Sequence, residues 1–366
     1  MRTVAKGECP AVNGVQRTIN FESASDKSPN GNRPISLVTG VAGFIGSHVA
    51  SELLRLGHSV IGLDDLSGGF VENIPNGVFF IEGSVNDARL LARLFDNYGF
   101  HYVFHLAAYA AEGLSHFVRR FNYQNNLLGS VNLINAAVNA GTVRCFVFTS
   151  SIAVYGKLPP PMTEALAPRP VDPYGVAKYA VELDLAAARE MFGLEHIIFR
   201  PHNVYGQNQH AGDLYRNVIG IFMKQILEGC PLTLFGDGSQ TRAFTHVSEV
   251  APVIAASVTR RAAYNQVFNL GSGEATSILD LARMVSEAMG APLRVEHLPA
   301  RLEAQDAWCS HEKTLGVFGD LIRPVRLAEG LAQMAQWIKQ TGWRRGRQFQ
   351  QIEIEKRMPA CWAASD

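Results

Sequence analysis

The sequence has no excess of either charge, because 33 Lys and Arg residues are balanced by 33 Asp and Glu residues. Proteins that bind nucleic acid or an anionic membrane surface usually carry a basic excess, so neither partner is expected. No apolar run reaches the roughly 20 residues that a membrane-spanning helix needs. Residues 1–33 also lack an apolar core of signal-peptide type. These absences favour a cytoplasmic globular protein.

Cysteine is scarce and scattered along the chain. The five cysteines form no C-x-x-C pair, which argues against a disulfide framework. We therefore expect reduced thiols and no metal centre. Cys145 and Cys230 have apolar neighbours and are expected to be buried packing residues.

Short apolar runs and helix-like segments alternate regularly from residue 35 to about residue 206. The expected strands are 35–39, 59–63, 78–82, 102–106, 144–149 and 195–200, and the expected helices are 45–56, 88–97, 121–140 and 172–191. Buried parallel strands are typically continuous apolar runs, and this alternation is typical of a doubly wound sheet. The predicted fold class is α/β: a Rossmann-type doubly wound parallel sheet with a smaller C-terminal α/β substrate-binding domain.

The composition and the spacing of apolar runs also divide the chain into four segments. We expect a flexible arm at 1–33, the sheet domain at 34–205, a smaller domain at 206–342 interleaved with it, and a tail at 343–366. Helices are expected in the smaller domain at 218–228, 277–289 and 327–341. The tail has no evident core partner.

A glycine-rich turn lies between the first predicted strand and helix, with Gly40, Gly43 and Gly46 at G-x-x-G-x-x-G spacing. Glycines let the backbone turn tightly and approach a pyrophosphate, which the helix N-terminus stabilises. Asp64 ends the next strand, 18 residues beyond Gly46. A carboxylate there accepts hydrogen bonds from ribose hydroxyls and repels a 2′-phosphate. The pattern predicts an NAD site, and the alternative for Asp64 alone is a turn or helix cap.

Tyr174 and Lys178 share one face of the predicted helix 172–191, because they are four residues apart. A nearby ammonium favours the phenolate, so Lys178 is expected to lower the pKa of Tyr174. Such a tyrosine can exchange a proton with a hydroxyl near neutral pH. Ser151 follows the fifth predicted strand at the sheet edge where ligands bind. We expect its hydroxyl to bond the reacting oxygen.

These motifs occur together in one family. Residues 35 to about 315 resemble an extended short-chain dehydrogenase/reductase of the NAD-dependent nucleotide-sugar epimerase/dehydratase family, and most of all its UDP-hexose (UDP-glucose) 4-epimerases. The matching stretches are 39–46, 64–67, 105–108, 150–156, 172–178, 200–206 and 235–242. The resemblance implies an NAD cofactor, a UDP-sugar substrate, and a homodimer formed through 121–140 and 172–191.

Matching each motif in turn, the resemblance also implies the site residues. Catalysis is assigned to Ser151, Tyr174 and Lys178. Cofactor contacts are assigned to Gly40, Gly43, Phe44, Ile45, Gly46, Asp64, Asp65, Ser84, Val85, Leu106, Ala107, Ala108, Asn125, Tyr174, Lys178 and His202. Substrate contacts are assigned to Ser151, Tyr174, Asn203, Asn217, Thr233, Leu234, Phe235, Arg242 and Arg301. The chain departs from the family at Ser84, where aspartate is common, and after Arg301, where Gly-Asp is common.

The residues after Ser151 favour the simplest reaction of this family. Its dehydratases and decarboxylases commonly carry acids there, whereas this chain has Ile152 and Ala153, which cannot transfer protons. The resemblance then implies a 4-epimerase of the UDP-glucose/UDP-galactose type. Tyr174 would take the proton of the sugar 4-hydroxyl while hydride passes from C4 to NAD and returns to the other face.

Alternatives stay open at several positions. Arg216 could bind a carboxylate, which would suit UDP-glucuronate as the substrate. Two other functions stay open: another dehydratase or reductase of the family, and a non-catalytic NAD-binding scaffold. Glu112 and His116 could contact the sugar, although loop packing is preferred. At the sugar C2 pocket, one count along the chain places Trp308, which would exclude an N-acetyl group. The other count places Ala307, which would admit it.

Overall fold

The computed structural model describes residues 33–213, 215–300, 304–345, 352–359 and 362. The predicted arm lies outside these residues except for Arg33, and Arg301 lies outside them as well. Within the described part of the chain, no helix is both long enough and apolar enough to cross a membrane.

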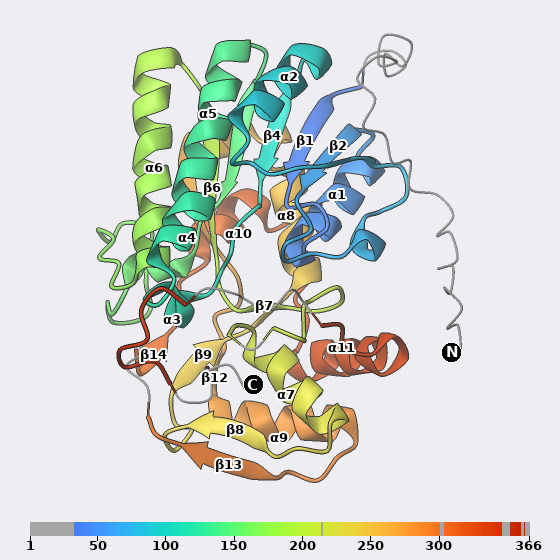
Figure 1. Cartoon of the computed structure of the whole chain (residues 1–366), viewed down its shortest axis with the longest axis vertical. Helices are drawn as coiled ribbons and strands as arrows, with labels where there is room; N and C mark the ends of the chain where they lie inside the picture. Colours follow the sequence, from blue (N-terminus) through green and yellow to red (C-terminus); the bar gives the residue numbers. More distant parts are fainter. Residues whose placement is uncertain (1–32, 214, 301–303, 346–351, 360–361, 363–366) are drawn as a thin grey trace, which may run out of the picture.

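A seven-stranded sheet forms the centre of the larger half of the molecule (Figure 1). The strands are β1 (Ile35–Thr39), β2 (Ser59–Asp64), β3 (Phe79–Glu82), β4 (Tyr102–His105), β5 (Cys145–Thr149), β6 (His196–Pro201) and β11 (Gln266–Leu270). Their order is β11-β6-β5-β4-β1-β2-β3, and every neighbouring pair is parallel. The predicted parallel sheet is confirmed. The strand order reverses between β1 and β4, which is where such sheets bind ligands.

Helices cover both faces of the sheet. Because side chains alternate along a strand, Leu37 and Val38 of β1 enter separate cores. Leu37 packs under the helices α2 (Ala88–Tyr98), α5 (Gly129–Ala140) and α6 (Pro173–Phe192). Val38 packs under α1 (Phe44–Arg55) and α8 (Val247–Ala256). This arrangement is the doubly wound fold.

Several elements of this half were not predicted, and two of them are central to its packing. The first is β11, whose Gln-Val-Phe-Asn-Leu sequence mixes polar and apolar residues and follows the change of rhythm after residue 206. The second is α8, which contains Pro252, a residue that argues against a helix in the sequence. Since both elements pack in the sheet half although they follow residue 206, the chain returns to the sheet after entering the smaller half.

The predicted helix 121–140 is interrupted in the structure. It consists of α4 (Arg119–Tyr123), a π turn η3 (Gln124–Leu128) and α5. A π turn holds an extra residue, and such turns are frequent at functional sites. Here the π turn carries Asn126, which is hydrogen bonded to Tyr109 in the loop that follows β4, and Asn125, which accepts from Asn86.

The smaller half lies beyond the carboxyl ends of the large sheet's strands (Figure 1). Its helices are α7 (Val218–Leu227), α9 (Ile278–Met289) and α11 (Leu327–Thr341), close to the predicted bounds. Its short strands are β7 (Val204–Tyr205), β8 (Leu232–Phe235), β9 (Thr241–Ala243), β10 (Thr245–His246), β12 (Ala275–Ser277), β13 (Val295–Leu298) and β14 (Asp306–Ala307). Its core includes Phe222, Leu234 and Leu281.

The structure corrects two predictions about packing. Cys145 is buried in β5 as expected, whereas Cys230 is exposed in the turn between α7 and β8. The C-terminal tail does have a packing partner: Trp362 is only 7% exposed and packs with Ala111, Leu114 and Val118.

Candidate active site

One cleft runs along the carboxyl ends of the strands and faces the smaller half. Its lining includes all the residues predicted to contact the cofactor and all three predicted catalytic residues. Of the predicted substrate contacts, Asn203, Asn217, Thr233, Phe235 and Arg242 line the same cleft. Leu234 does not line the cleft, because its side chain is completely buried in the core of the smaller half. Arg301 lies outside the described residues.

The glycine turn is too tight for side chains. Gly40 has φ +74, and a Cβ on Gly46 would lie 1.9 Å from the Gly40 carbonyl oxygen. Helix α1 begins directly after Gly43, and no side chain caps it. The first amides of this helix therefore face the cleft as donors for an anion. This geometry fits the pyrophosphate of a dinucleotide.

Asp64 supports the same turn. Its carboxylate accepts hydrogen bonds from the amides of Ala42, at 3.0 Å, and Leu66, at 2.8 Å. Burial raises the pKa of Asp64, and these two amides oppose that shift. The carboxylate is therefore a cap of the glycine loop and also lines the cleft at the end of β2. These residues fit NAD. Asp64 would accept hydrogen bonds from the hydroxyls of its ribose.

The π turn fixes the loop that follows β4. Asn126 accepts a hydrogen bond from the amide of Tyr109 at 2.8 Å and donates to its carbonyl at 3.0 Å. Asn125 accepts from Asn86 at 2.9 Å. Sequence reasoning identified Asn125 but missed Asn126, although the consecutive Asn pair was a visible signal.

Tyr174 and Lys178 lie one turn apart on α6, as their spacing predicts. Asp172 caps this helix by accepting from the Gly175 amide at 2.8 Å. Lys178 Nζ donates to the Thr149 carbonyl at 2.8 Å and lies 5.8 Å from the centre of the Tyr174 ring. Hydrogen bonding by Ser151 lowers the pKa of the Tyr174 phenol, and the Ser151 hydroxyl also accepts from the Ala153 amide at 3.1 Å. Serine, phenol and ammonium are therefore contiguous at the end of β5.

The pKa of Tyr174 differs from the prediction. Burial raises it above the ordinary tyrosine value, and the charge of Glu112 raises it further, while the hydrogen bond from Ser151 and the charge of Arg216 lower it. Burial also lowers the pKa of Lys178 to about 7, against the opposing charge of Glu182. In the site formed by the chain alone, desolvation therefore outweighs the expected effect of the ammonium on the phenol.

A buried polar network lies next to the predicted catalytic residues. Glu182 accepts from the Ser150 hydroxyl at 2.5 Å and from Arg200 Nε at 2.9 Å. Arg200 also donates to the Tyr155 hydroxyl at 2.7 Å, which donates to Asn269 at 2.8 Å. Sequence reasoning missed this network. The signal was Glu182, which stands one helical turn beyond Lys178 on the same face of α6.

The residues predicted to bind the diphosphate have protein partners. Arg242 donates to the carbonyls of Thr241, Gln305 and Ala304 at 2.8, 3.1 and 2.8 Å. Asn203 donates to the carbonyl of Ala243 at 2.9 Å. These bonds fix both side chains along β9 at the edge of the cleft.

Two other predicted contacts are Asn217, which directly precedes a helix, and His202, whose ring packs against another histidine. Asn217 adopts φ +67 directly before α7. His202 Nε2 donates to the Ser272 carbonyl at 3.0 Å, and its ring stacks on His311 at 5.0 Å between centroids. Burial lowers the pKa of His202 to about 4, so the ring is neutral at physiological pH. Both residues line the cleft.

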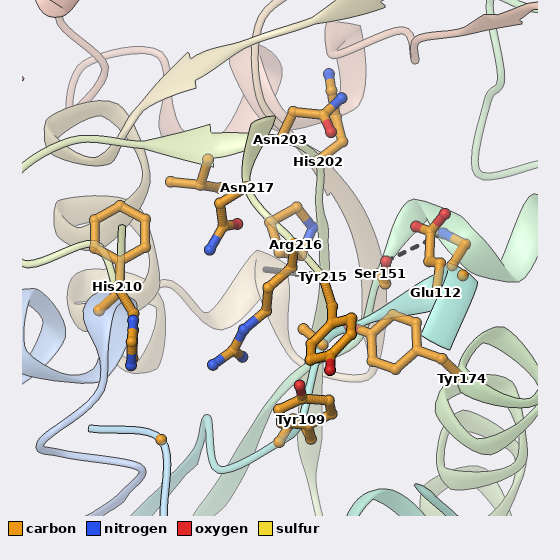
Figure 2. Close-up of a pocket in the computed structure, with 18 of the residues that line it drawn as sticks. Tyr109, Glu112, Ser151, Tyr174, His202, Asn203, His210, Tyr215, Arg216 and Asn217 are labelled. Carbon is orange, nitrogen blue, oxygen red and sulfur yellow. Dashed lines mark hydrogen bonds between the residues drawn. The ribbon is translucent and has the colours of Figure 1, made fainter. Parts of the chain in front are cut away.

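Charged and aromatic side chains gather near Tyr174, as Figure 2 shows for Tyr109, Tyr215 and Arg216. Arg216 pairs with Asp213 at 2.8 Å, and its guanidinium lies 4.7 Å from the centre of the Tyr109 ring. Tyr174, the predicted proton carrier, lines the cleft together with these three residues.

The loop after β4 contributes to the same end of the cleft. Ser115 donates to the Glu112 carbonyl at 2.6 Å and accepts from the Tyr174 amide at 3.2 Å, so it has a packing role. Glu112 and His116 are exposed and line the cleft. Ala307 also lines the cleft, whereas Trp308 does not.

Comparison with known proteins gives consistent results. Residues 36–271 match the model of the NAD dependent epimerase/dehydratase family. The chain is 36% identical over 313 residues to the UDP-glucose 4-epimerase of Mycolicibacterium smegmatis, a match that covers 83% of this chain and 98% of that protein.

Solved structures agree with the sequence match. The structure of UDP-glucose 4-epimerase from Thermotoga maritima with UDP-glucose is 33% identical, with a TM-score of 0.79, covering 84% of this chain and 99% of that chain. UDP-glucuronic acid 4-epimerase from Bacillus cereus, in complex with UDP-glucuronic acid and NAD, is 29% identical, with a TM-score of 0.77, covering 84% and 99%. The chain therefore belongs to the NAD dependent epimerase/dehydratase family.

Proposed function

We propose that the protein is a 4-epimerase of UDP-activated hexoses of the glucose/galactose type, acting through a transient 4-keto sugar. The observation that carries this proposal is the contiguous set of Ser151, Tyr174 and Lys178, with Ile152 and Ala153 beside it in the cleft. When bound, NAD supplies the acceptor and later the donor of the C4 hydride. Residues 34–205 provide most of the cofactor contacts and 206–342 most of the sugar-nucleotide contacts.

The proton follows a short path. Tyr174 removes the proton of the 4-hydroxyl as hydride leaves C4, and it returns the proton to the 4-oxygen when hydride comes back to the opposite face. Ser151 bonds the same oxygen, and Lys178 stabilises the phenolate form of Tyr174 that accepts the proton. Elimination of water would need a further acid and base beside the reacting carbon, and neither Ile152 nor Ala153 can act as one.

The lining of the cleft also bears on the sugar's second carbon. Ala307, whose side chain is a single methyl group, lines the cleft, and Trp308 does not. With Ala307 next to C2 of the sugar, the cleft would accept a substrate with either a hydroxyl or an acetamido group at that carbon. The epimerase is therefore expected to act on UDP-glucose and on UDP-N-acetylglucosamine.

A UDP-glucuronate 4-epimerase is the second candidate, supported by Arg216 in the lining. The guanidinium is already paired with Asp213 and packed on Tyr109. A substrate carboxylate would have to compete with the Asp213 carboxylate for the same donors. This competition favours a neutral hexose over a hexuronate.

The direct test is a panel of UDP-hexoses, UDP-N-acetylhexosamines and UDP-hexuronates incubated with the full chain and NAD. Products are resolved by NMR. Conversion of UDP-glucose to UDP-galactose and the reverse is the expected outcome. Binding of NAD without conversion of any sugar would support the scaffold alternative, and loss of water or of CO₂ would identify a dehydratase or a decarboxylase.

The identity of residue 307 is expected to control the C2 substituent. Ala307→Tyr should lower kcat/KM for UDP-N-acetylglucosamine by about 10- to 100-fold relative to UDP-glucose, because the larger side chain fills that space. Trp308→Ala, a change next to it outside the lining, should leave the ratio unchanged. A ratio that stays constant in the tyrosine variant would contradict this assignment.

A homodimer is also proposed, through α4, α5 and α6. The outer side of α6 exposes Val176 and Leu183, which are seven residues apart and share a face, and Leu128 is exposed on the neighbouring π turn. Apolar side chains exposed together on adjacent helices suit a four-helix interface. Figure 1 shows α5 and α6 side by side at one edge of the molecule.

The dimer proposal predicts that Leu183→Glu shifts the protein toward monomer in sedimentation velocity, because it places a charge in the apolar interface. Leu315→Glu changes an equally exposed leucine on α10 (Glu312–Phe318) and should leave the association state unchanged. A wild-type protein that sediments as a monomer would overturn the proposal.

A further inference from the structure

The C-terminal segment returns to the cleft and contributes one of its walls. Trp362 lines the cleft and is almost completely buried. Its ring lies edge-on to Phe117, at 6.1 Å between centroids, and edge-on to Tyr215, at 5.6 Å. The indole therefore touches two segments that are about 100 residues apart in sequence, the loop after β4 and the segment before α7.

The segment that precedes Trp362 is anchored by specific hydrogen bonds. The two carboxylate oxygens of Glu353 accept from the amides of Arg120, at 2.8 Å, and Phe121, at 3.0 Å, at the beginning of α4. The Phe117 carbonyl accepts from the amides of Glu353 and Ile354 at 2.8 and 3.2 Å. A carboxylate at a helix N-terminus is favoured by the helix dipole. The segment is thus fastened to the same loop that Trp362 covers.

Both segments that Trp362 bridges act on the reactive tyrosine. The loop after β4 carries Glu112, whose charge raises the pKa of Tyr174, and Ser115, whose hydroxyl accepts from the Tyr174 amide. Tyr215 directly precedes Arg216, whose charge lowers the same pKa. Trp362 therefore lies beside the two segments that border Tyr174, where the proposed sugar would react.

We propose that Trp362 is a specificity-determining residue that forms the outer wall of the sugar subsite, and that the segment 352–359 holds it there. This inference rests on the proposed UDP-hexose substrate. An indole offers apolar surface to the C–H edges of a pyranose ring and no charge for a carboxylate, so it selects neutral hexoses. The match to the Thermotoga maritima epimerase covers 99% of that chain and 84% of this one, so this chain has segments beyond that match.

The test compares binding of UDP-glucose with binding of UDP alone, using NAD-saturated full-length protein in titration calorimetry. Trp362→Ala should weaken UDP-glucose about tenfold, the effect of losing one large apolar contact, and leave UDP unchanged. NAD affinity should stay near that of wild type, whereas the thermal midpoint should fall because a nearly buried indole is lost. Ile354→Ala, which truncates an exposed apolar side chain in the same segment, should change neither ligand.

Gly113 allows a second, independent test. A Cβ added there would lie 2.9 Å from the indole Cη2, and the three nearest atoms to it all belong to Trp362. Gly113→Ala should therefore displace the indole and weaken UDP-glucose in the wild-type background. In the Trp362→Ala background the same change should add no further loss, because the indole, the nearest group to that Cβ among the described residues, is gone.

The outcomes separate this inference from the proposed function. Equal weakening of UDP and UDP-glucose, an unchanged affinity for UDP-glucose, or additive effects of the two substitutions would overturn the role of Trp362. Sugar-specific weakening in a protein that binds but never epimerises UDP-glucose would overturn the epimerase proposal and leave the wall in place.

Discussion

Tyr174→Phe is expected to reduce kcat for UDP-glucose epimerisation by about 10²–10⁴-fold, the range for loss of a general acid and base. In the proposed mechanism the phenol carries the proton, and Ile152 and Ala153, which also line the cleft, cannot replace it. Removing one hydroxyl leaves the ring and its packing, so NAD affinity should stay within a few-fold of wild type. A steady-state assay and NAD titration measure both quantities.

Tyr179 provides the matched control for this substitution. It lies on the same helix, is partly buried and does not line the cleft. Tyr179→Phe should therefore retain wild-type kcat. A single-turnover experiment adds a second readout, because the Tyr174→Phe protein should not accumulate reduced cofactor when UDP-glucose is added. Undiminished turnover by that variant would rule out the proposed proton path.

Glu182→Ala is expected to destabilise the protein by about 3–5 kcal/mol, since it leaves a buried guanidinium without its counter-ion. The side chains of Arg200 and Glu182 are only 4% and 5% exposed, and two Arg200 nitrogens donate to the carboxylate. Replacing both residues, as in Glu182→Leu with Arg200→Met, should recover much of the stability because no unpaired charge remains. Urea unfolding measures each variant.

A surface ion pair provides the control for this prediction. Arg261 and Glu195 also form a short ion pair, but the Arg261 side chain is largely exposed. Glu195→Ala should cost no more than about 1 kcal/mol. Similar losses of unfolding free energy in Glu182→Ala and Glu195→Ala would contradict the prediction that an unpaired buried charge is the main cost of removing Glu182.

The same network affects the charge of Lys178. Glu182 raises the pKa of Lys178 against the dominant effect of burial. Glu182→Gln keeps most of the shape but removes the charge, so the folded-state pKa of Lys178 should fall further below about 7. Lys178 then loses its proton at a lower pH, and the descending limb of the pH–rate profile should move toward acid.

The local patterns of the sequence predicted much of the fold and the family. Apolar runs such as 145–149 are buried as predicted, and the expected family is confirmed by the match over residues 36–271. The elements that were missed depend on distant contacts. Strand β11 is specified by pairing with β6, and α8 by packing against α1 despite Pro252.

The site was predicted less completely than the fold. Motifs identified the residues that now line one cleft, but they contain no information on desolvation, which reverses the expected shift of the Tyr174 pKa. They also gave no sign of Trp362, because its partners lie some 140 and 250 residues earlier in the chain. Such contacts become visible only when the chain is folded.

The position of β11 has a consequence for how the protein is made. All six residues of β6 are buried, and its outer edge is covered only by β11, which begins at Gln266. During synthesis, or in a fragment that ends near residue 205, the main-chain donors and acceptors on that edge would face water beside apolar side chains such as Phe199. An open apolar edge is prone to pair with other chains. The segment 34–205 therefore lacks one edge strand of its sheet, and its protection from aggregation depends on residues translated after α7 and β8 of the smaller half.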